Sequence, residues 1–196
     1  MSDAVVTKWL PEGILDEEQS RQFAIKNSNE NPQAIALLTR DPNEFVGHMV
    51  FHPFAMQTYE IGWVLGREHQ GRGYATEAAK SLVAYAFESL QCHRVIATCQ
   101  PENVASWRVM EKLEMRREGL FRKCIARASG EWWDEYFYAI LAEEYFRGAE
   151  QGERRREVRQ GCEQCARRPR RFYHQLDRGV CELKSFARLL VSIPPA

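Results

Sequence analysis

Two neighbouring segments with different periodicity stand near the middle of the chain. Between residues 59 and 65 apolar side chains occupy every second position, which is the period of a pleated β-strand. From residue 75 onward the period lengthens, and the apolar residues fall on one face of a helix: Ala75, Ala78, Ala79, Leu82, Val83, Ala86 and Leu90. The pattern therefore predicts a strand, a short loop and a long helix, in that order.

The loop between this strand and helix has the sequence Gln70-Gly71-Arg72-Gly73-Tyr74-Ala75. A glycine-bearing turn that opens a helix exposes backbone N–H groups at the positive end of the helix dipole, an arrangement that binds phosphate. The loop lacks the Lys and Ser/Thr pair of a P-loop and the third glycine of a dinucleotide-binding fingerprint. Taken alone, it is also compatible with an ordinary glycine-rich turn.

The remaining pattern predicts a sheet that mixes hairpins with crossovers. Asp16 is placed to cap a helix over residues 17–26. Further strands are expected at residues 34–39, 45–51, 94–99, 119–128 and 131–141, and a short helix at residues 105–113. The pair His52-Pro53 is expected to end the second of these strands. This order of elements favours an α+β mixed sheet over a doubly wound parallel one.

The composition is that of one globular domain with an additional segment. The chain has 196 residues, of which 44% are apolar, and this length suits one well-packed domain plus extra chain. No run of apolar residues is long enough to predict a membrane span, and the first ten residues do not resemble a signal peptide. The six cysteines form no disulfide framework, so we expect a reducing, cytoplasmic setting.

The net charge of zero conceals a division of the chain. Residues 148–196 carry 11 basic and 6 acidic side chains, whereas residues 1–147 carry 16 and 21. We therefore expect a main domain at residues 1–147 and a basic, partly disordered tail with arginines and cysteines at residues 148–196. Arginine clusters at 154–156 and 167–171 permit nucleic-acid binding, but a solvated extension explains them more simply. The tail residues Cys162, Cys165, His174 and Cys181 lack a usual zinc spacing, so no metal site is predicted.

Several spaced motifs resemble the GNAT superfamily of N-acetyltransferases, and in particular its branch of ribosomal-protein N-terminal acetyltransferases (Rim type). They occur in the family's order within residues 34–146: residues 60–65, 70–77, 93–95, 101–106, 111–113 and 117–119. Gln70, Gly73 and Ala75 match the Gln-x-x-Gly-x-Ala spacing of the acetyl-CoA pyrophosphate loop. The resemblance implies an α+β fold with a mostly antiparallel sheet, a splayed central strand pair and flanking helices.

The resemblance also implies which residues bind acetyl-CoA. The strands at 59–65 and 94–99 would diverge and leave a V-shaped slot for the pantetheine arm. Backbone groups near Val64 and Leu65 would pair with that arm and would also serve as an oxyanion hole. Asn103 would contact the cofactor. The pyrophosphate would be held by the backbone amides of the loop, with added charge from its arginine: Gln70, Gly71, Arg72, Gly73, Tyr74 and Ala75.

Acetyl transfer needs a base for the acceptor amine and an acid for the leaving thiolate. Glu60 is the candidate base, because it is the one charge in an apolar strand and burial would raise its pKa. A solvent-facing or ion-paired Glu60 is the alternative. Many members of the family carry a tyrosine seven residues after the asparagine, where this chain has Met110. Ser106 is therefore the candidate acid, with a purely structural role at the start of the helix as the alternative.

The chain departs from the family in two places. The family normally has a first strand and a first helix, and there is no room for them ahead of residues 5–10. We therefore expect this chain to lack both elements. Such an open edge would leave unpaired backbone groups and favour association, for example into a homodimer, unless the apolar residues 183–193 cover it. Glu114 stands where the short helix should end in a glycine with positive φ, at a cost of roughly 1 kcal/mol.

These features predict an acetyl-CoA-dependent N-acetyltransferase that works by direct attack of a primary amine and needs no metal. The acceptor is a protein N-terminus or a small amine, either polyamine-like or aminoglycoside-like. Two alternatives stay open: a non-catalytic acyl-CoA-binding or interaction module, and a basic-tailed protein that associates with RNA or the ribosome. We expect no membrane partner, and nucleic acid is a less expected partner than an amine.

Overall fold

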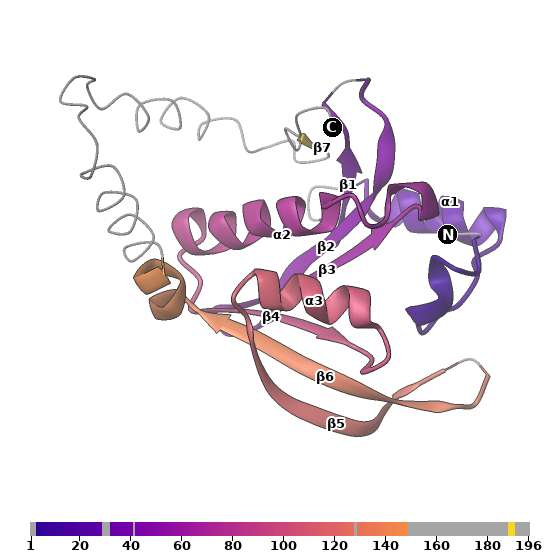
Figure 1. Cartoon of the computed structure of the whole chain (residues 1–196). Helices are drawn as coiled ribbons and strands as arrows, with labels where there is room; N and C mark the ends of the chain where they lie inside the picture. Colours follow the sequence, from indigo (N-terminus) through magenta and orange to yellow (C-terminus); the bar gives the residue numbers. More distant parts are fainter. Residues whose placement is uncertain (1–2, 29–31, 41, 128, 149–187, 191–196) are drawn as a thin grey trace.

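A mixed β-sheet forms the centre of the protein (Figure 1). The computed structural model describes residues 3–28, 32–40, 42–127, 129–148 and 188–190. Within these residues seven strands pair in the order β5-β6-β4-β3-β2-β1-β7: β1 Ala34–Leu38, β2 Phe45–Ala55, β3 Thr58–Leu65, β4 Arg94–Cys99, β5 Arg116–Ala126, β6 Trp132–Leu141 and β7 Arg188–Leu190. The pairs β3–β4 and β1–β7 are parallel and the other four are antiparallel, which confirms the predicted α+β class.

The helices connect these strands much as the sequence predicts. Their bounds are α1 Glu17–Lys26, α2 Tyr74–Ala84 and α3 Val104–Lys112, with 3₁₀ turns η1 Thr7–Trp9 and η2 Arg67–His69 and a π-helical turn η3 Tyr85–Ser89. Residues 142–148 are also helical. The cap predicted for α1 is confirmed, because the Asp16 carboxylate accepts the N–H of Gln19 at 2.8 Å. The Gln19 side chain in turn accepts the N–H of Asp16 at 2.9 Å, which completes a capping box.

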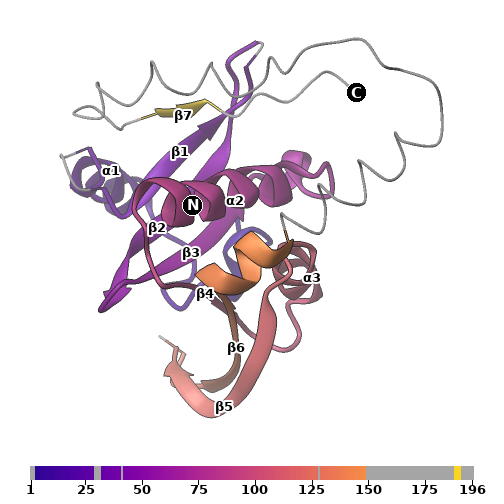
Figure 2. The same cartoon turned by 90° about the vertical axis from the view of Figure 1, so that its left-hand side faces the viewer.

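Helices cover both faces of the sheet. Neighbouring residues of a strand point to opposite faces, and β2 shows what lies on each. Met49 belongs to the buried core together with Leu82 of α2, whereas the ring of His48 lies 5.3 Å from that of Phe23 in α1. Helices α2 and α3 therefore cover one face, and α1 covers part of the other, as Figure 2 shows.

The long helix predicted after the glycine loop is present but changes its winding. It runs as an α-helix through Ala84 and continues as the π-helical turn η3, in which the N–H of Leu90 reaches the carbonyl of Tyr85 at 3.1 Å. This wider turn accompanies the burial of Phe87, whose ring lies 5.1 Å from that of Tyr145. On the sheet side α2 presents small, fully buried residues, which allow the helix to lie close to the strands: Ala78 and Ala79.

The expectation that His52-Pro53 ends strand β2 is wrong. The strand continues to Ala55, and Pro53 pairs with Tyr59 of β3. Proline is tolerated here because, among the described residues, the last hydrogen bond from β2 toward the β1 side is that from the N–H of Phe51 to the carbonyl of Gln33, at 3.0 Å. Two residues later a missing N–H on this side costs little.

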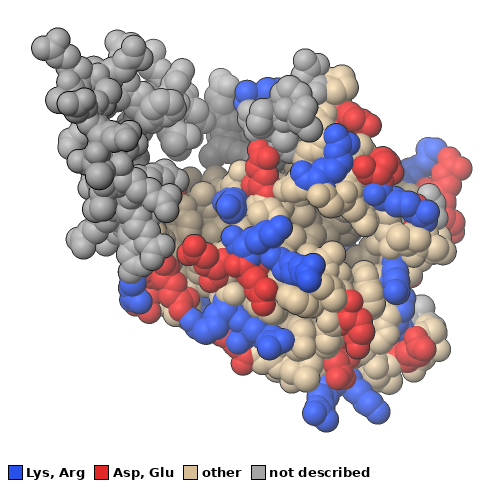
Figure 3. Space-filling view, in the orientation of Figure 1, with Lys and Arg blue, Asp and Glu red and all other residues tan. Residues whose placement is uncertain are grey.

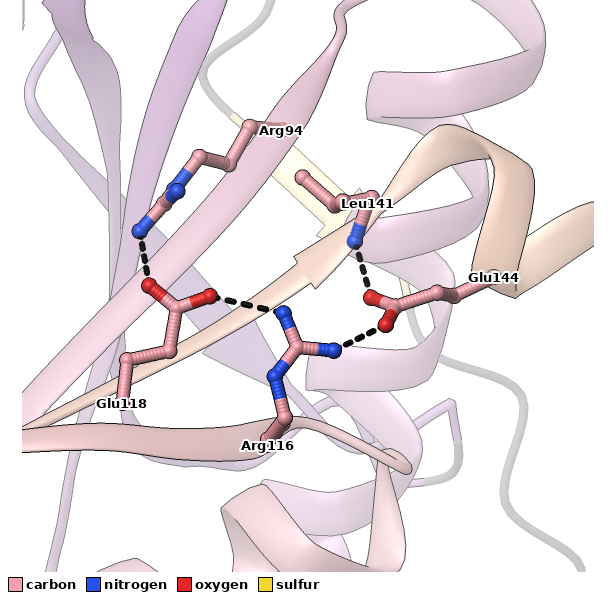
Figure 4. A network of polar contacts seen from close by, with 5 residues as sticks. All are labelled: Arg94, Arg116, Glu118, Leu141 and Glu144. Carbon is pink, nitrogen blue, oxygen red and sulfur yellow. Dashed lines mark hydrogen bonds and ion pairs between the residues drawn. The ribbon is translucent and has the colours of Figure 1, made fainter.

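A network of ion pairs fastens the outer strand β5 to the rest of the sheet (Figure 4). Glu118 binds the guanidinium of Arg94 in β4 and, at 2.8 Å, that of Arg116. Arg116 also pairs with Glu144, which accepts the N–H of Leu141 at 2.9 Å. Individual surface pairs contribute little to stability, but this chain of contacts joins β4, β5 and the helical residues 142–148.

The outer edge of β1 is covered by residues from the end of the chain. Arg188, Leu189 and Leu190 pair in parallel with Ala36, Leu37 and Leu38, as Figure 1 shows. Among the described residues ahead of β1 there are the turn η1 and the helix α1 but no strand, and the position next to β1 is taken by β7. The rest of the apolar segment 183–193 lies outside the described residues, as do the arginine clusters and the Cys162–Cys181 set.

We predict that a chain ending at residue 187 is less stable than a chain ending at residue 190. Losing β7 leaves the backbone groups of Ala36–Leu38 without strand partners, at a net cost of about 1 kcal/mol. For a chain of this size that lowers Tm by about 2–4 °C. The chain that ends at residue 190 is the matched control, because it lacks only the last six residues and keeps β7. Equal melting temperatures and equal oligomeric states for the two chains would contradict this role of β7.

We also predict that Glu114→Gly stabilises the protein. Glu114 has a φ of 61° directly after α3, the left-handed conformation that the sequence predicted for it. Glycine adopts this conformation without steric cost, so thermal unfolding should show a gain of about 1 kcal/mol. Glu111→Gly is the control. It places glycine inside the same helix, where a loss of about 1 kcal/mol is expected, and a loss in both variants would show that φ is not the cause.

Candidate active site

A slot opens where strands β3 and β4 cease to pair. Their parallel pairing joins residues 58–60 to residues 94–96 and ends at the pair Glu60 and Ile96. Both strands continue beyond this point, to Leu65 and to Cys99, without further pairing to each other. A pocket of about 790 Å³ lies at this divergence, lined by residues of β3, β4, the glycine loop, α3 and the N-terminal segment. The predicted splayed strand pair is therefore present.

The glycine loop has the conformation of an anion-binding turn. Gly71 and Gly73 have φ of 74° and 89°, values at which an L-residue is strained. Gly73 is the N-cap of α2, and no side chain of the described residues caps this helix, so the first-turn N–H groups keep their hydrogen-bonding capacity. The side chain of Gln70 donates a hydrogen bond to the carbonyl oxygen of Leu65 at 3.1 Å, which ties the loop to β3.

A second helix begins at the same pocket. The side chain of Asn103 is the N-cap of α3 and accepts the N–H of Ser106 at 3.3 Å. Both residues line the pocket, and so does Met110, which is 1% exposed and fills the position where many family members have a tyrosine. Asn103 thus has a structural role in starting α3, in addition to its place beside the slot.

The structure brings together nine of the eleven residues that the sequence singled out. The following line the pocket: Glu60, Val64, Leu65, Gln70, Gly71, Gly73, Ala75, Asn103 and Ser106. Arg72 and Tyr74 do not. Tyr74 is 8% exposed and packs in the core, and the guanidinium of Arg72 lies 5.2 Å from the centre of the Tyr74 ring. At these two positions only the backbone N–H groups, and not the side chains, are available for binding a phosphate.

Glu60 lies at the point where the two strands diverge. Its side chain is 25% exposed and lies 3.8 Å from Nε2 of His52, which is its neighbour across β2 and β3. Burial raises the pKa of Glu60 above its usual value, and a positive charge on His52 would lower it. A carboxylate with a raised pKa accepts a proton more readily, which is the property needed in a general base near neutral pH.

Glu135 in β6 is a second carboxylate of this pocket, and the sequence analysis missed it. Burial raises the pKa of Glu135, a hydrogen bond from Thr98 lowers it, and the negative charge of Glu60 raises it. The available signal was the one used for Glu60, since Glu135 also interrupts an aromatic strand.

The N-terminal segment forms one wall of the pocket. Several residues between positions 5 and 11 line it, including Lys8 and Trp9. Trp9 packs against Trp133 of β6, with 6.0 Å between the ring centres, and Arg127 lies 3.5 Å above the Trp133 ring. The pocket is therefore walled on this side although no described strand precedes β1.

The fold and this pocket agree with the family to which the sequence is similar. The family model described as an acetyltransferase (GNAT) domain matches residues 1–116. The chain belongs to the GNAT acetyltransferase family, which confirms the predicted superfamily and the prediction of an N-acetyltransferase.

Bacterial relatives match most of the domain. The chain is 50% identical over 145 residues to the uncharacterised N-acetyltransferase YnaD of Bacillus subtilis (strain 168), which covers 74% of this chain and 85% of that protein. A crystal structure of a GNAT-family acetyltransferase from Bacillus anthracis is 51% identical, with a TM-score of 0.69, and covers 73% of this chain and 85% of the other. The ribosomal protein uS5 alanine N-acetyltransferase of Escherichia coli (strain K12) is 24% identical over 115 residues, which is 57% of this chain and 59% of that protein.

The described residues contain neither a cluster of metal ligands nor a membrane-spanning helix. No three His, Cys, Asp or Glu side chains in this part of the chain are grouped as metal ligands. None of the helices that the structure describes has the length and apolar character needed to cross a membrane.

We predict that Gly73→Ala weakens binding of acetyl-CoA, the acetyl donor of GNAT acetyltransferases, about tenfold in calorimetry. Alanine at a φ of 89° costs roughly 1–2 kcal/mol, which the loop avoids by leaving its phosphate-binding conformation. Gly130→Ala is the control, because Gly130 has a φ of 84° at the tip of the β5–β6 hairpin, with equally open space around it. Equal affinities in the two variants would show that the loop does not hold the cofactor.

Proposed function

We propose that this protein transfers the acetyl group of acetyl-CoA to a primary amine, with Glu60 as the general base. One observation carries the proposal. The carboxylate with burial-raised pKa lies at the divergence of β3 and β4, in the same pocket as the glycine loop that opens α2. A phosphate-binding turn and a poised base are thus held in one pocket by one sheet.

The residues present fit acetyl-CoA. The open amides at the start of α2, with Gly71 and Gly73 in the left-handed region, suit its pyrophosphate. The unpaired stretch of β3 after Glu60 offers backbone groups near Val64 and Leu65 to an extended chain. When bound, acetyl-CoA supplies an acetyl thioester.

In the proposed reaction Glu60 takes the proton that the acceptor nitrogen loses as it bonds to the acetyl carbon. The carbon–sulfur bond breaks, and the sulfur that leaves needs a proton in turn. Backbone N–H groups near Val64 and Leu65 are the proposed donors to the thioester oxygen, whose charge rises during the attack. Ser106 lines the pocket at the start of α3 and is the proposed proton donor to the sulfur.

The acceptor and the branch of the family are the finer part of the proposal. The motifs of the Rim-type branch, together with the Escherichia coli relative at 24% identity, support a protein N-terminus. The wall made by residues 5–11, in which Trp9 packs on Trp133, bounds the pocket on one side and supports a small amine instead. We favour the small amine, because this support comes from the pocket itself.

The surface seen in Figure 3 offers no large patch of one charge. Acidic and basic side chains are interspersed over the elements on this face. A nucleic-acid-binding face usually gathers Lys and Arg, so this side of the described domain does not support the RNA-associated alternative.

We predict that Glu60→Gln lowers kcat by about 10²- to 10⁴-fold with amine substrates, because the variant has no base to accept the amine proton. Thiol release from acetyl-CoA measures the rate, and calorimetry should show unchanged affinity for acetyl-CoA. In the wild type the rate should fall as the pH drops through the raised pKa of Glu60, and the variant should lack that loss.

The thermal stability of the Glu60→Gln variant provides the control for this prediction. The raised pKa means that proton uptake by Glu60 stabilises the fold at low pH and that this contribution is lost as the pH rises through that pKa. Removing the charge with glutamine should therefore leave the Tm at pH 7 unchanged or raise it. A variant that melts normally and keeps at least a third of the wild-type kcat would rule out Glu60 as the base.

A further inference from the structure

Glu60 and Glu135 lie on the same face of the sheet, on either side of β4. Glu60 is level with Ile96, and Thr98 lies two residues further along β4 on the same face. Thr98 is level with Phe137 of β6, and Glu135 lies two residues from Phe137 on that face. At the usual strand spacing, strands β3 and β6 are about 10 Å apart across β4, and Glu135 lies four positions, or about 13 Å, further along the strand direction than Glu60. Both carboxylates line the one pocket.

No Lys or Arg of the described residues forms an ion pair with either carboxylate, although Lys8, Arg108 and Lys112 line the same pocket. Glu135 forms no ion pair within the described part of the chain, and the one partner that Glu60 has there is His52, at 3.8 Å. Lys8 lines the pocket, but its ammonium nitrogen lies 4.5 Å from the centre of the Trp9 ring. Arg127 is similarly placed over Trp133. Arg108, which also lines the pocket, lies 5.7 Å from the centre of the Trp107 ring, so Lys8 and Arg108 both lie against aromatic rings.

The electrostatic effect of this arrangement is a raised pKa for both carboxyl groups. Burial raises the pKa of both carboxyls, and the charge of Glu60 raises that of Glu135 further. Two carboxylates in one partly buried pocket repel each other and are costly to ionise together. A ligand with two positive charges offsets both costs, whereas a ligand with one positive charge offsets only one.

We propose that Glu135 is the specificity-determining residue of the acceptor site and that the acceptor is a small amine with a second positive charge, such as a short diamine. This inference rests on the proposed acetyltransferase function and names its substrate class. Glu135 binds the distal ammonium and holds the substrate so that its other nitrogen lies at Glu60. Glu60 then accepts the proton of the reacting nitrogen, while Glu135 stays charged and keeps the substrate in place.

The two roles need two separate groups. A carboxylate that takes up the proton of the reacting amine loses its charge and, with it, its attraction for the substrate. With Glu135 as a separate anion, binding and proton transfer proceed without competing for one carboxylate. The wall formed by residues 5–11 over Trp133 favours a small dication over the N-terminus of a folded protein.

The test compares two amines of equal length on the full chain with saturating acetyl-CoA. 1,4-Diaminobutane carries the second charge and 1-aminobutane does not. Wild-type kcat/KM should be at least tenfold higher for the diamine, and Glu135→Gln should reduce this ratio about tenfold, mainly through a higher KM. The value of kcat/KM for the monoamine should change by less than threefold. A tenfold change corresponds to about 1.4 kcal/mol, within the range of one charge-assisted contact.

Glu131→Gln is the matched control, because Glu131 lies at the tip of the same hairpin, is exposed and does not line the pocket. It should leave the ratio unchanged. Glu135→Gln should melt no lower than the wild type at pH 7, since the substitution removes a charge whose pKa is raised. Glu135→Asp, which keeps the charge, should retain part of the preference for the diamine.

The outcomes separate this inference from the proposed function. Acetylation of both amines with equal kcat/KM, or an unchanged ratio in Glu135→Gln, overturns the role of Glu135 and leaves the acetyltransferase proposal standing. The role of Glu135 is also overturned if a peptide with uncharged side chains is acetylated at its N-terminus faster than the diamine is acetylated. That result would favour a protein acceptor. No thiol release with any of the three acceptors overturns the proposed function and this inference together.

Discussion

The short pairing of β3 with β4 is the constraint on which the site depends. Only three residue pairs join the two strands, and beyond Glu60 their facing backbone groups have no partner in the sheet. Unpaired buried N–H and C=O groups are costly. The strands keep this arrangement because each is held from its other side, β3 by β2 up to Leu65 and β4 by β6 along all its residues. The slot therefore presents backbone hydrogen-bonding groups that the sheet itself leaves unpaired.

The rest of the fold gives the pocket an electrostatic polarity. Helices α2 and α3 both begin at the pocket, so their positive dipole ends point toward it. Glu60 and Glu135 contribute negative charge from the opposite face of the sheet. One part of the pocket consequently suits the phosphates of acetyl-CoA, and another suits an ammonium group. In the proposed reaction this polarity would orient both substrates.

Most of the fold could be predicted because it follows from local patterns. The Asp16 cap, the bounds of β4 and the left-handed Glu114 each depend on a few neighbouring residues, and all three predictions are confirmed. The continuation of β2 through Pro53 could not be predicted, because it depends on where β1 stops pairing.

Glu135 was missed for a related reason. Whether an acidic residue in a strand faces solvent or a pocket depends on register across three strands, and no local pattern contains that register. The proximity of β7 to β1 likewise arises from pairing between residues about 150 positions apart. The alternation along one strand reveals that it has two faces but does not reveal what each face meets.

The position of β7 has a consequence for the order in which the protein is completed during synthesis. The strands from β1 to β6 leave the ribosome before Arg188 is translated, so the outer side of β1 must wait through the synthesis of residues 39–187 for its neighbour. Domains begin to fold while synthesis continues. The nascent chain can therefore form the pocket-bearing part of the sheet while the outer side of β1 still lacks β7 as its neighbour.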